Sequence, residues 1–159
     1  MEILETLRAL NACFGPSGQE GAVAEAIRKI AAPYVDECTV DTLGNLLCHK
    51  KGKGPKVLFA AHMDSIGLIV THIDEHGFLR FGPVGGLSAH EALGAPVRFA
   101  NGVRGVVALE GKVEAKEMKL EHLYVDIGAR DEKEARAMVQ VGDVAVYDTA
   151  AFQSGSRIF

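Results

Sequence analysis

The stretch Val97-Arg98-Phe99-Ala100-Asn101-Gly102-Val103-Arg104-Gly105-Val106-Val107 carries the strongest fold signal of the chain. Two runs rich in β-branched and aromatic residues flank an Asn-Gly pair. Such a pair strongly favours a tight turn between antiparallel strands. The pattern therefore predicts a β-hairpin, with strands over residues 97–100 and 103–109.

Further short strands are predicted on both sides of this hairpin. They are apolar or alternating runs separated by glycine-containing turns, and they cover residues 68–73, 78–81, 123–127 and 144–147. Many short strands with frequent turns are typical of a small barrel or sandwich. One helix is expected to interrupt them, from Asp131 to about Val139, because Asp131 and Glu134 form a D-x-x-E start.

The first part of the chain has a different pattern, typical of an α/β fold. Apolar residues at helical spacing predict a helix from Ile3 to about Ala12. The S-x-x-E motif of Ser17 and Glu20 predicts a capping box that opens a second helix. Strands are then expected over 34–41, 46–49 and 56–62. The last is a continuous apolar run, as in a central strand covered on both faces. The change of pattern falls near residues 67–73.

The composition limits the classes of protein to which the chain can belong. Its 159 residues are 48% apolar and 24% charged, which is typical of a soluble globular protein. The net charge of −4 gives no electrostatic footprint for nucleic acid. No run approaches the roughly 20 apolar residues that span a bilayer, so no membrane partner is expected.

The N-terminus and the cysteines favour a cytoplasmic location. The acidic start of the chain lacks the pattern of a signal peptide. Cys13, Cys38 and Cys48 are odd in number and widely spaced, so a disulfide framework is not expected and reduced thiols are. A metal-binding role for these cysteines is the less favoured alternative.

His62-Met63-Asp64, at the end of the predicted strand 56–62, is the strongest candidate for chemistry. In an extended chain, residues i and i+2 point to the same face, so Asp64 can orient the imidazole of His62 for metal binding. Ligands also gather at the carboxyl ends of strands in α/β sheets. The alternative is a core histidine with satisfied hydrogen bonds. The other histidines are expected on the surface or in loops: His49, His72, His76, His90 and His122.

Five segments in this order resemble those of the tetrahedral aminopeptidase family of co-catalytic metallopeptidases, which includes glutamyl aminopeptidases and proteins labelled endoglucanase. They are Phe14-Gly15-Pro16-Ser17-Gly18-Gln19-Glu20, Asp41-Thr42-Leu43-Gly44-Asn45-Leu46, Ala60-Ala61-His62-Met63-Asp64-Ser65-Ile66-Gly67-Leu68, Gly85-Gly86 and Asp126-Ile127-Gly128-Ala129.

The resemblance implies an α/β catalytic domain with a mixed sheet and a small inserted β-barrel dimerisation domain. The catalytic domain would begin at 1–69, the barrel would cover 70–150, and 151–159 would start the return to the catalytic domain. It also implies two divalent metal ions, zinc or cobalt, with His62 as a metal ligand and Asp64 as the catalytic residue that supports it. The substrates would be short peptides, hydrolysed at the N-terminal peptide bond by a metal-activated water.

The chain departs from the family pattern in two ways. Members of the family are about twice as long, and their other ligands and general base lie beyond the position of Phe159. The chain is therefore expected to be an N-terminal half that is inactive alone. Ser65 also stands where an acidic residue is common, which leaves substrate preference open.

Two other functions are compatible with parts of the pattern. The chain could be a non-catalytic module that forms homo-oligomers through its barrel. Glycoside hydrolysis is the second alternative. It would need paired carboxylates at a sugar cleft, and the chain has no Trp and only 6% aromatic residues for stacking on sugars.

Overall fold

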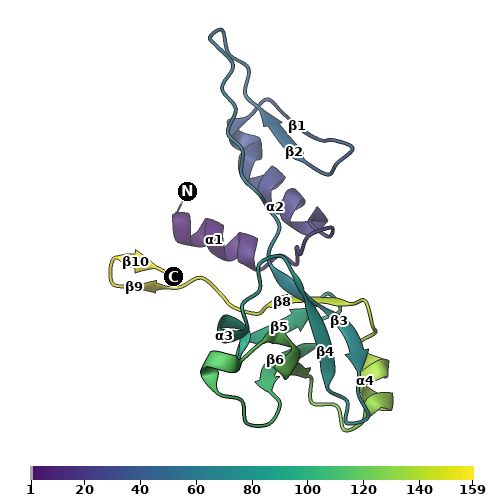
Figure 1. Ribbon diagram of the computed structural model, residues 1–159. Helices are drawn as coiled ribbons and strands as arrows, with labels where there is room; N and C mark the ends of the chain where they lie inside the picture. Colours follow the sequence, from purple (N-terminus) through teal and green to yellow (C-terminus); the bar gives the residue numbers. More distant parts are fainter. Residues whose placement is uncertain (1) are drawn as a thin grey trace. The chain divides into compact units, whose positions relative to one another are not determined.

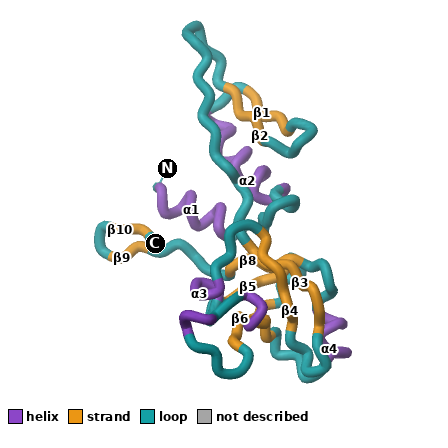
Figure 2. The backbone as a smooth tube through the Cα atoms, in the orientation of Figure 1, coloured by secondary structure: helices purple, strands orange, loops and turns teal. Residues whose placement is uncertain are grey.

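The computed structural model describes residues 2–159, which form two compact units (Figures 1 and 2). One unit consists of residues 2–64 together with Ala150–Phe159, and the other is Ser65–Thr149. The chain thus leaves the first unit, builds the second as one continuous segment, and then returns to the first.

The unit Ser65–Thr149 is a closed barrel of six antiparallel strands in the order β3-β4-β7-β6-β5-β8 (Figure 1). The strands are β3 (Gly67–Ile73), β4 (Leu79–Val84), β5 (Pro96–Phe99), β6 (Arg104–Leu109), β7 (Leu123–Asp126) and β8 (Val144–Tyr147). Each predicted strand of this region is confirmed to within a few residues at its ends. Between the two folds left open by the sequence, the closed sheet identifies a barrel.

The predicted hairpin at Asn101-Gly102 joins β5 to β6. Phe99 donates its backbone N–H to the carbonyl of Val103 at 2.8 Å, which closes a loop of three residues. Gly102 has a φ of 89°, a left-handed conformation that a glycine adopts without strain. Asn101 accepts the N–H of Val103 on its side-chain oxygen at 3.0 Å, which further fixes the turn.

The core of the barrel is built from alternate residues of all six strands. Those with no more than 2% exposure include Leu68, Val70, Ile73, Leu79, Val97, Phe99, Val107, Leu123, Val125 and Ala145. The helix α4 (Glu132–Met138) adds Ala135 to this core. Its predicted start is confirmed, because the carboxylate of Asp131 accepts the N–H of Glu134 at 2.8 Å. Short helical turns complete the unit: α3 (Ala89–Ala92), η2 (Ala115–Glu117) and η3 (Leu120–His122).

The other unit contains two helices and two small hairpins. Its elements are α1 (Ile3–Asn11), α2 (Gly21–Ala31), η1 (Ala32–Tyr34), β1 (Glu37–Val40), β2 (Leu46–His49), β9 (Gln153–Ser154) and β10 (Arg157–Ile158). Both predicted helices and the β1–β2 pair are confirmed. Arg8 of α1 donates to the carbonyl of Ala151 at 3.0 Å, which ties the last segment of the chain to the first helix.

The predicted central strand over 56–62 is wrong for this structure. No residue from 55 to 64 belongs to a strand, and the segment is drawn as a loop in Figure 2. Leu58 and Phe59 are 85% and 92% exposed. An apolar run becomes a central strand only when other strands bond to both of its edges. Among the described residues β1 and β2 pair with each other, and neither pairs with 56–62.

Within residues 2–159, no helix combines the length and the hydropathy needed to cross a bilayer.

The pairing of β6 with β7 leaves no room for a side chain at Gly105 in β6. A Cβ at this position would lie 2.7 Å from the carbonyl oxygen of Asp126 and 2.7 Å from a methyl group of Val125, both in β7. We expect Gly105→Ala to destabilise the barrel by about 1–3 kcal/mol, because a paired backbone cannot move aside. Urea titration followed by the NMR amide signals of the strands measures this loss.

Gly86→Ala is the matched control. Among the described residues, apart from its two neighbours in the chain, no atom lies within 4 Å of a Cβ built at Gly86, and its φ is outside the left-handed region. We expect its free energy of unfolding to stay within about 0.5 kcal/mol of the parent. Equal stability of the two variants would contradict the close approach of β6 and β7.

Candidate active site

His62 and Asp64 come together as their spacing in an extended chain predicts. The Nδ1 atom of His62 lies 3.0 Å from Oδ1 of Asp64 and 3.0 Å from the backbone carbonyl oxygen of Asp64. Both partners of Nδ1 are acceptors when the carboxyl is ionised, so Nδ1 carries the proton. In the neutral ring, Nε2 then holds the free lone pair. This tautomer leaves Nε2 free to bind a metal, while the carboxylate orients the ring.

The imidazole of His62 is open to solvent. Its side chain is 85% exposed and that of Asp64 is 36% exposed. The alternative of a core histidine is therefore wrong for this structure. An exposed imidazole with one nitrogen fixed by a carboxylate is available to bind a ligand.

Ser17 adds a third member to this arrangement, which the sequence analysis missed. Its hydroxyl donates to Oδ2 of Asp64 at 2.5 Å. The predicted capping box is thus wrong. Helix α2 begins after Glu20 without a side-chain cap, and Glu20 instead accepts the N–H of Gly18 at 2.7 Å. The S-x-x-E pattern fits both arrangements, and no local signal in the sequence distinguishes them.

The Ser17 hydroxyl and the His62 imidazole together lower the pKa of the Asp64 carboxyl below its ordinary 3.8. The hydrogen bond from Ser17 is the larger cause and the one from His62 comes second. Both bonds favour the charged form of the carboxyl. Asp64 is therefore an anion at neutral pH and keeps the Nδ1 proton of His62 in place.

The turn between β1 and β2 has a similar design. Asp41 accepts the N–H groups of Leu43 and Asn45, each at 2.9 Å, and the side-chain amide of Asn45 at 2.8 Å. These bonds, the amide of Asn45 first, lower the pKa of the Asp41 carboxyl. Residues Asp41–Asn45, which belong to the segment Asp41–Leu46 of the family resemblance, thus form a turn fixed by its own aspartate.

This turn and the His62 segment border one hollow of about 480 Å³. Its wall is mostly apolar and includes the polar side chains of His62 and Asp64. The lining residues are Glu20, Ile27, Leu43–Leu47 and Leu58–Asp64. A concave apolar surface with a few polar groups is the usual form of a ligand site.

The described residues do not form a complete metal site. A catalytic zinc takes about three protein ligands, and within residues 2–159 no three His, Cys, Asp or Glu side chains converge to hold an ion. His62 fits a single ligand position, with Nε2 as the donor.

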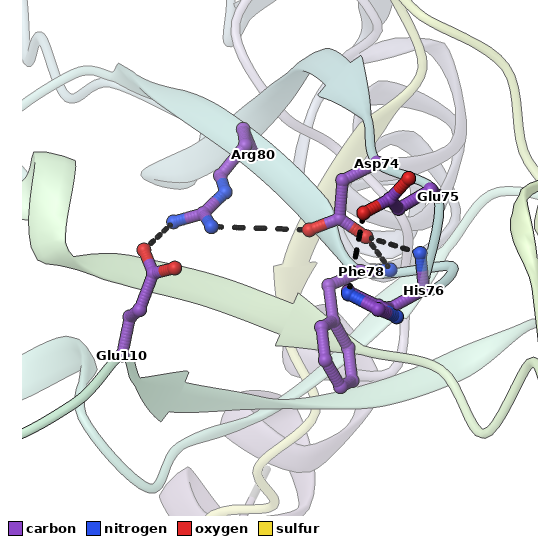
Figure 3. Close-up of polar contacts among 6 residues, drawn as sticks. All are labelled: Asp74, Glu75, His76, Phe78, Arg80 and Glu110. Atoms are coloured by element: carbon purple, nitrogen blue, oxygen red, sulfur yellow. Dashed lines mark hydrogen bonds and ion pairs between the residues drawn. The ribbon is translucent and has the colours of Figure 1, made fainter.

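A second cluster of polar side chains lies on the barrel, where it closes a turn and connects strands (Figure 3). Asp74 accepts the N–H groups of His76 and Phe78 at 3.0 and 2.9 Å, which closes the β3–β4 turn. Arg80 pairs with Glu110 at 2.6 Å and lies 3.8 Å from Asp74. The Glu110 partner raises the pKa of Arg80, whose guanidinium also lies 5.9 Å from the ring centre of Tyr124. The cluster joins β4 to the end of β6.

Comparisons with known proteins identify the family of the chain. Residues 44–158 match the family described as M42 glutamyl aminopeptidase. A relative from Acetivibrio thermocellus, named provisionally as an aminopeptidase, is 46% identical over 158 residues, which are 99% of this chain and 48% of the relative.

Solved structures give the same result. The aminopeptidase APDkam598 from Desulfurococcus kamchatkensis superposes with a TM-score of 0.86 at 34% identity, over 96% of this chain and 45% of that one. The TET1 peptidase of Pyrococcus horikoshii, described as assembling into a tetrahedron or a large octahedral shell, gives 0.79 at 31% identity, over 95% and 48%. The chain spans about half the length of the relatives it matches.

The shared carboxylate of Asp64 gives a prediction about pH. In Ser17→Ala we expect the pKa of Asp64 to rise, because the larger stabiliser of the anion is gone. The two bonds stabilise the fold fully above pH 3.8, and their contribution disappears as the pH falls through the lowered folded-state value. The NMR signal of the side-chain carboxyl carbon of Asp64, recorded as a function of pH, measures this pKa.

Thr6→Ala is the control, since it removes a hydroxyl of the same unit that donates to the carbonyl of Glu2 instead. An Asp64 pKa that is the same in Ser17→Ala as in the parent would show that the serine does not hold the carboxylate.

Proposed function

The chain belongs to the M42 glutamyl aminopeptidase family, and from this premise we propose that it forms part of an enzyme that removes N-terminal residues from short peptides. In this proposal the residues of the first unit begin a catalytic domain of mixed α/β type, and His62 is a ligand to one of two divalent metal ions, zinc or cobalt. The observation that carries the proposal is the bond from Nδ1 of His62 to Asp64, which leaves Nε2 as the donor.

Each residue of the site has a distinct task. His62 presents Nε2 to the metal. Asp64 holds the proton on Nδ1 and fixes the ring. Ser17 holds Asp64 from the loop between α1 and α2. Divalent metals in such enzymes supply a water nucleophile at neutral pH and polarise the scissile carbonyl. The remaining ligands would come from parts of the protein that correspond to the second half of the relatives.

The barrel is proposed as a dimerisation domain inserted in the catalytic domain. The sequence prediction gave it residues 70–150, between catalytic segments at 1–69 and 151–159. The compact unit Ser65–Thr149 supports this division. The assembly of the Pyrococcus horikoshii peptidase into a tetrahedron or a large octahedral shell supports homo-oligomers. The cytoplasmic location and the identity of the metals remain predictions from the sequence.

A fusion protein tests the proposed activity. The chain is joined after Phe159 to the second half of the Acetivibrio thermocellus relative, and leucyl- and glutamyl-anilides are offered with cobalt or zinc. We expect metal-dependent release of the N-terminal residue. His62→Ala should lower kcat/KM at least about 100-fold, and Asp64→Asn should weaken metal binding about 10–100-fold.

The matched control is His76→Ala, an exposed histidine of the β3–β4 turn, which should leave the activity unchanged. A fusion that forms a stable dimer in sedimentation but shows neither turnover nor metal binding dependent on His62 would contradict the proposal. That result would favour the oligomerisation module instead.

A further inference from the structure

Cys38 and Cys48 face each other across the β1–β2 hairpin. They are direct partners in the antiparallel register, and their sulfur atoms lie 2.8 Å apart, within hydrogen-bonding distance. Neither cysteine is in a disulfide. The proposed peptidase function gives this pair no task.

The position of the pair in the ladder suits a cross-link. Asp41 donates its backbone N–H to the carbonyl of Asn45 at 3.0 Å, so these two residues are a hydrogen-bonded pair. Such pairs alternate with non-hydrogen-bonded ones, and the cysteines lie three positions further along. They therefore occupy a non-hydrogen-bonded position, where Cα atoms are about 4.5 Å apart. That separation lies inside the range of about 4.4–6.8 Å that a disulfide spans.

The pair is accessible to small reagents. Cys48 is exposed and Cys38 is partly exposed. The hydrogen bond with Cys38, together with burial, raises the pKa of the Cys48 thiol, and the positive charge of Arg28 on α2 opposes this rise. Since the thiolate is the attacking form, the exchange is best followed at about pH 8.5.

We propose that Cys38 and Cys48 are a reversible dithiol–disulfide site that exchanges with small disulfides such as oxidised glutathione. One cysteine thiolate attacks a sulfur of the small disulfide, forms a mixed disulfide and expels one small thiolate. The second cysteine, as a thiolate, attacks the protein sulfur of this mixed disulfide and releases the other small thiol. The protein loses two hydrogens and two electrons pass to glutathione, so the exchange balances.

The cross-link would stabilise the hairpin that borders the hollow beside His62. The turn residues between β1 and β2 line that hollow, and Cys38 and Cys48 lie on the two strands that lead to it. Oxidation would join these strands covalently and restrict movement of the turn. This inference does not depend on the proposed peptidase function.

The 159-residue chain is equilibrated with glutathione buffers, the exchange is stopped with acid, and free thiols and linked peptides are identified by mass spectrometry. In the parent and in Cys13→Ser we expect the free thiols of Cys38 and Cys48 to disappear together. The mass of the protein should fall by about 2 Da, because two hydrogens are lost. The internal disulfide should exceed mixed adducts at least about tenfold, because the second attack is intramolecular. In Cys38→Ser and Cys48→Ser only mixed adducts should form.

Separate glutathione adducts on Cys38 and Cys48 without an internal link would overturn the proposal, and so would a link from Cys13 to either of them. Amide NMR spectra of the oxidised protein give a second check. The link must form while the signals of β1 and β2 persist. A link that forms only after those signals are lost would also overturn the proposal, since the native hairpin would not be its origin.

Discussion

The site depends on the two hydrogen bonds that the carboxylate of Asp64 accepts from side chains. One of its oxygens accepts the hydroxyl of Ser17, which lies 47 positions earlier, and the other accepts the imidazole of His62. Because both oxygens are occupied, the carboxylate can move only if one of these bonds breaks. A single anion thus joins the loop after α1 to the segment before β3 and selects the tautomer of the histidine. The exposed ring needs no burial to hold its orientation.

The sequence predicts the elements of the barrel more completely than it predicts the contacts of the site. The β5–β6 hairpin and the start of α4 depend on contacts within a few residues, so Asn101-Gly102 and the D-x-x-E of Asp131 predict them directly. The spacing of His62 and Asp64 also predicts their contact. The bond between Ser17 and Asp64 is long-range, and S-x-x-E equally suits a helix cap. For Lys56–His62, hydropathy predicts burial but cannot supply the neighbouring strands that burial requires.

The two units differ in how completely they bury their apolar side chains. The barrel closes its sheet on itself and buries a continuous apolar core from all six strands. In the other unit Val57, Leu58 and Phe59 are largely exposed, although their composition is that of a core strand. The chain spans about half the length of the relatives it matches, and its first unit holds the hydrogen bonds of Asp64 with Ser17 and His62.

The most direct test of the His62–Asp64 arrangement is to measure which ring nitrogen of His62 carries the proton. Long-range nitrogen–proton NMR distinguishes the two ring nitrogens of each histidine, and at about pH 9 an ordinary histidine is neutral. Because Asp64 accepts from Nδ1, we expect the His62 ring to carry its proton on Nδ1 and to leave Nε2 unprotonated. A ring that carries its proton mainly on Nε2 would contradict the proposed role of His62, because the nitrogen proposed as the metal donor would then be blocked.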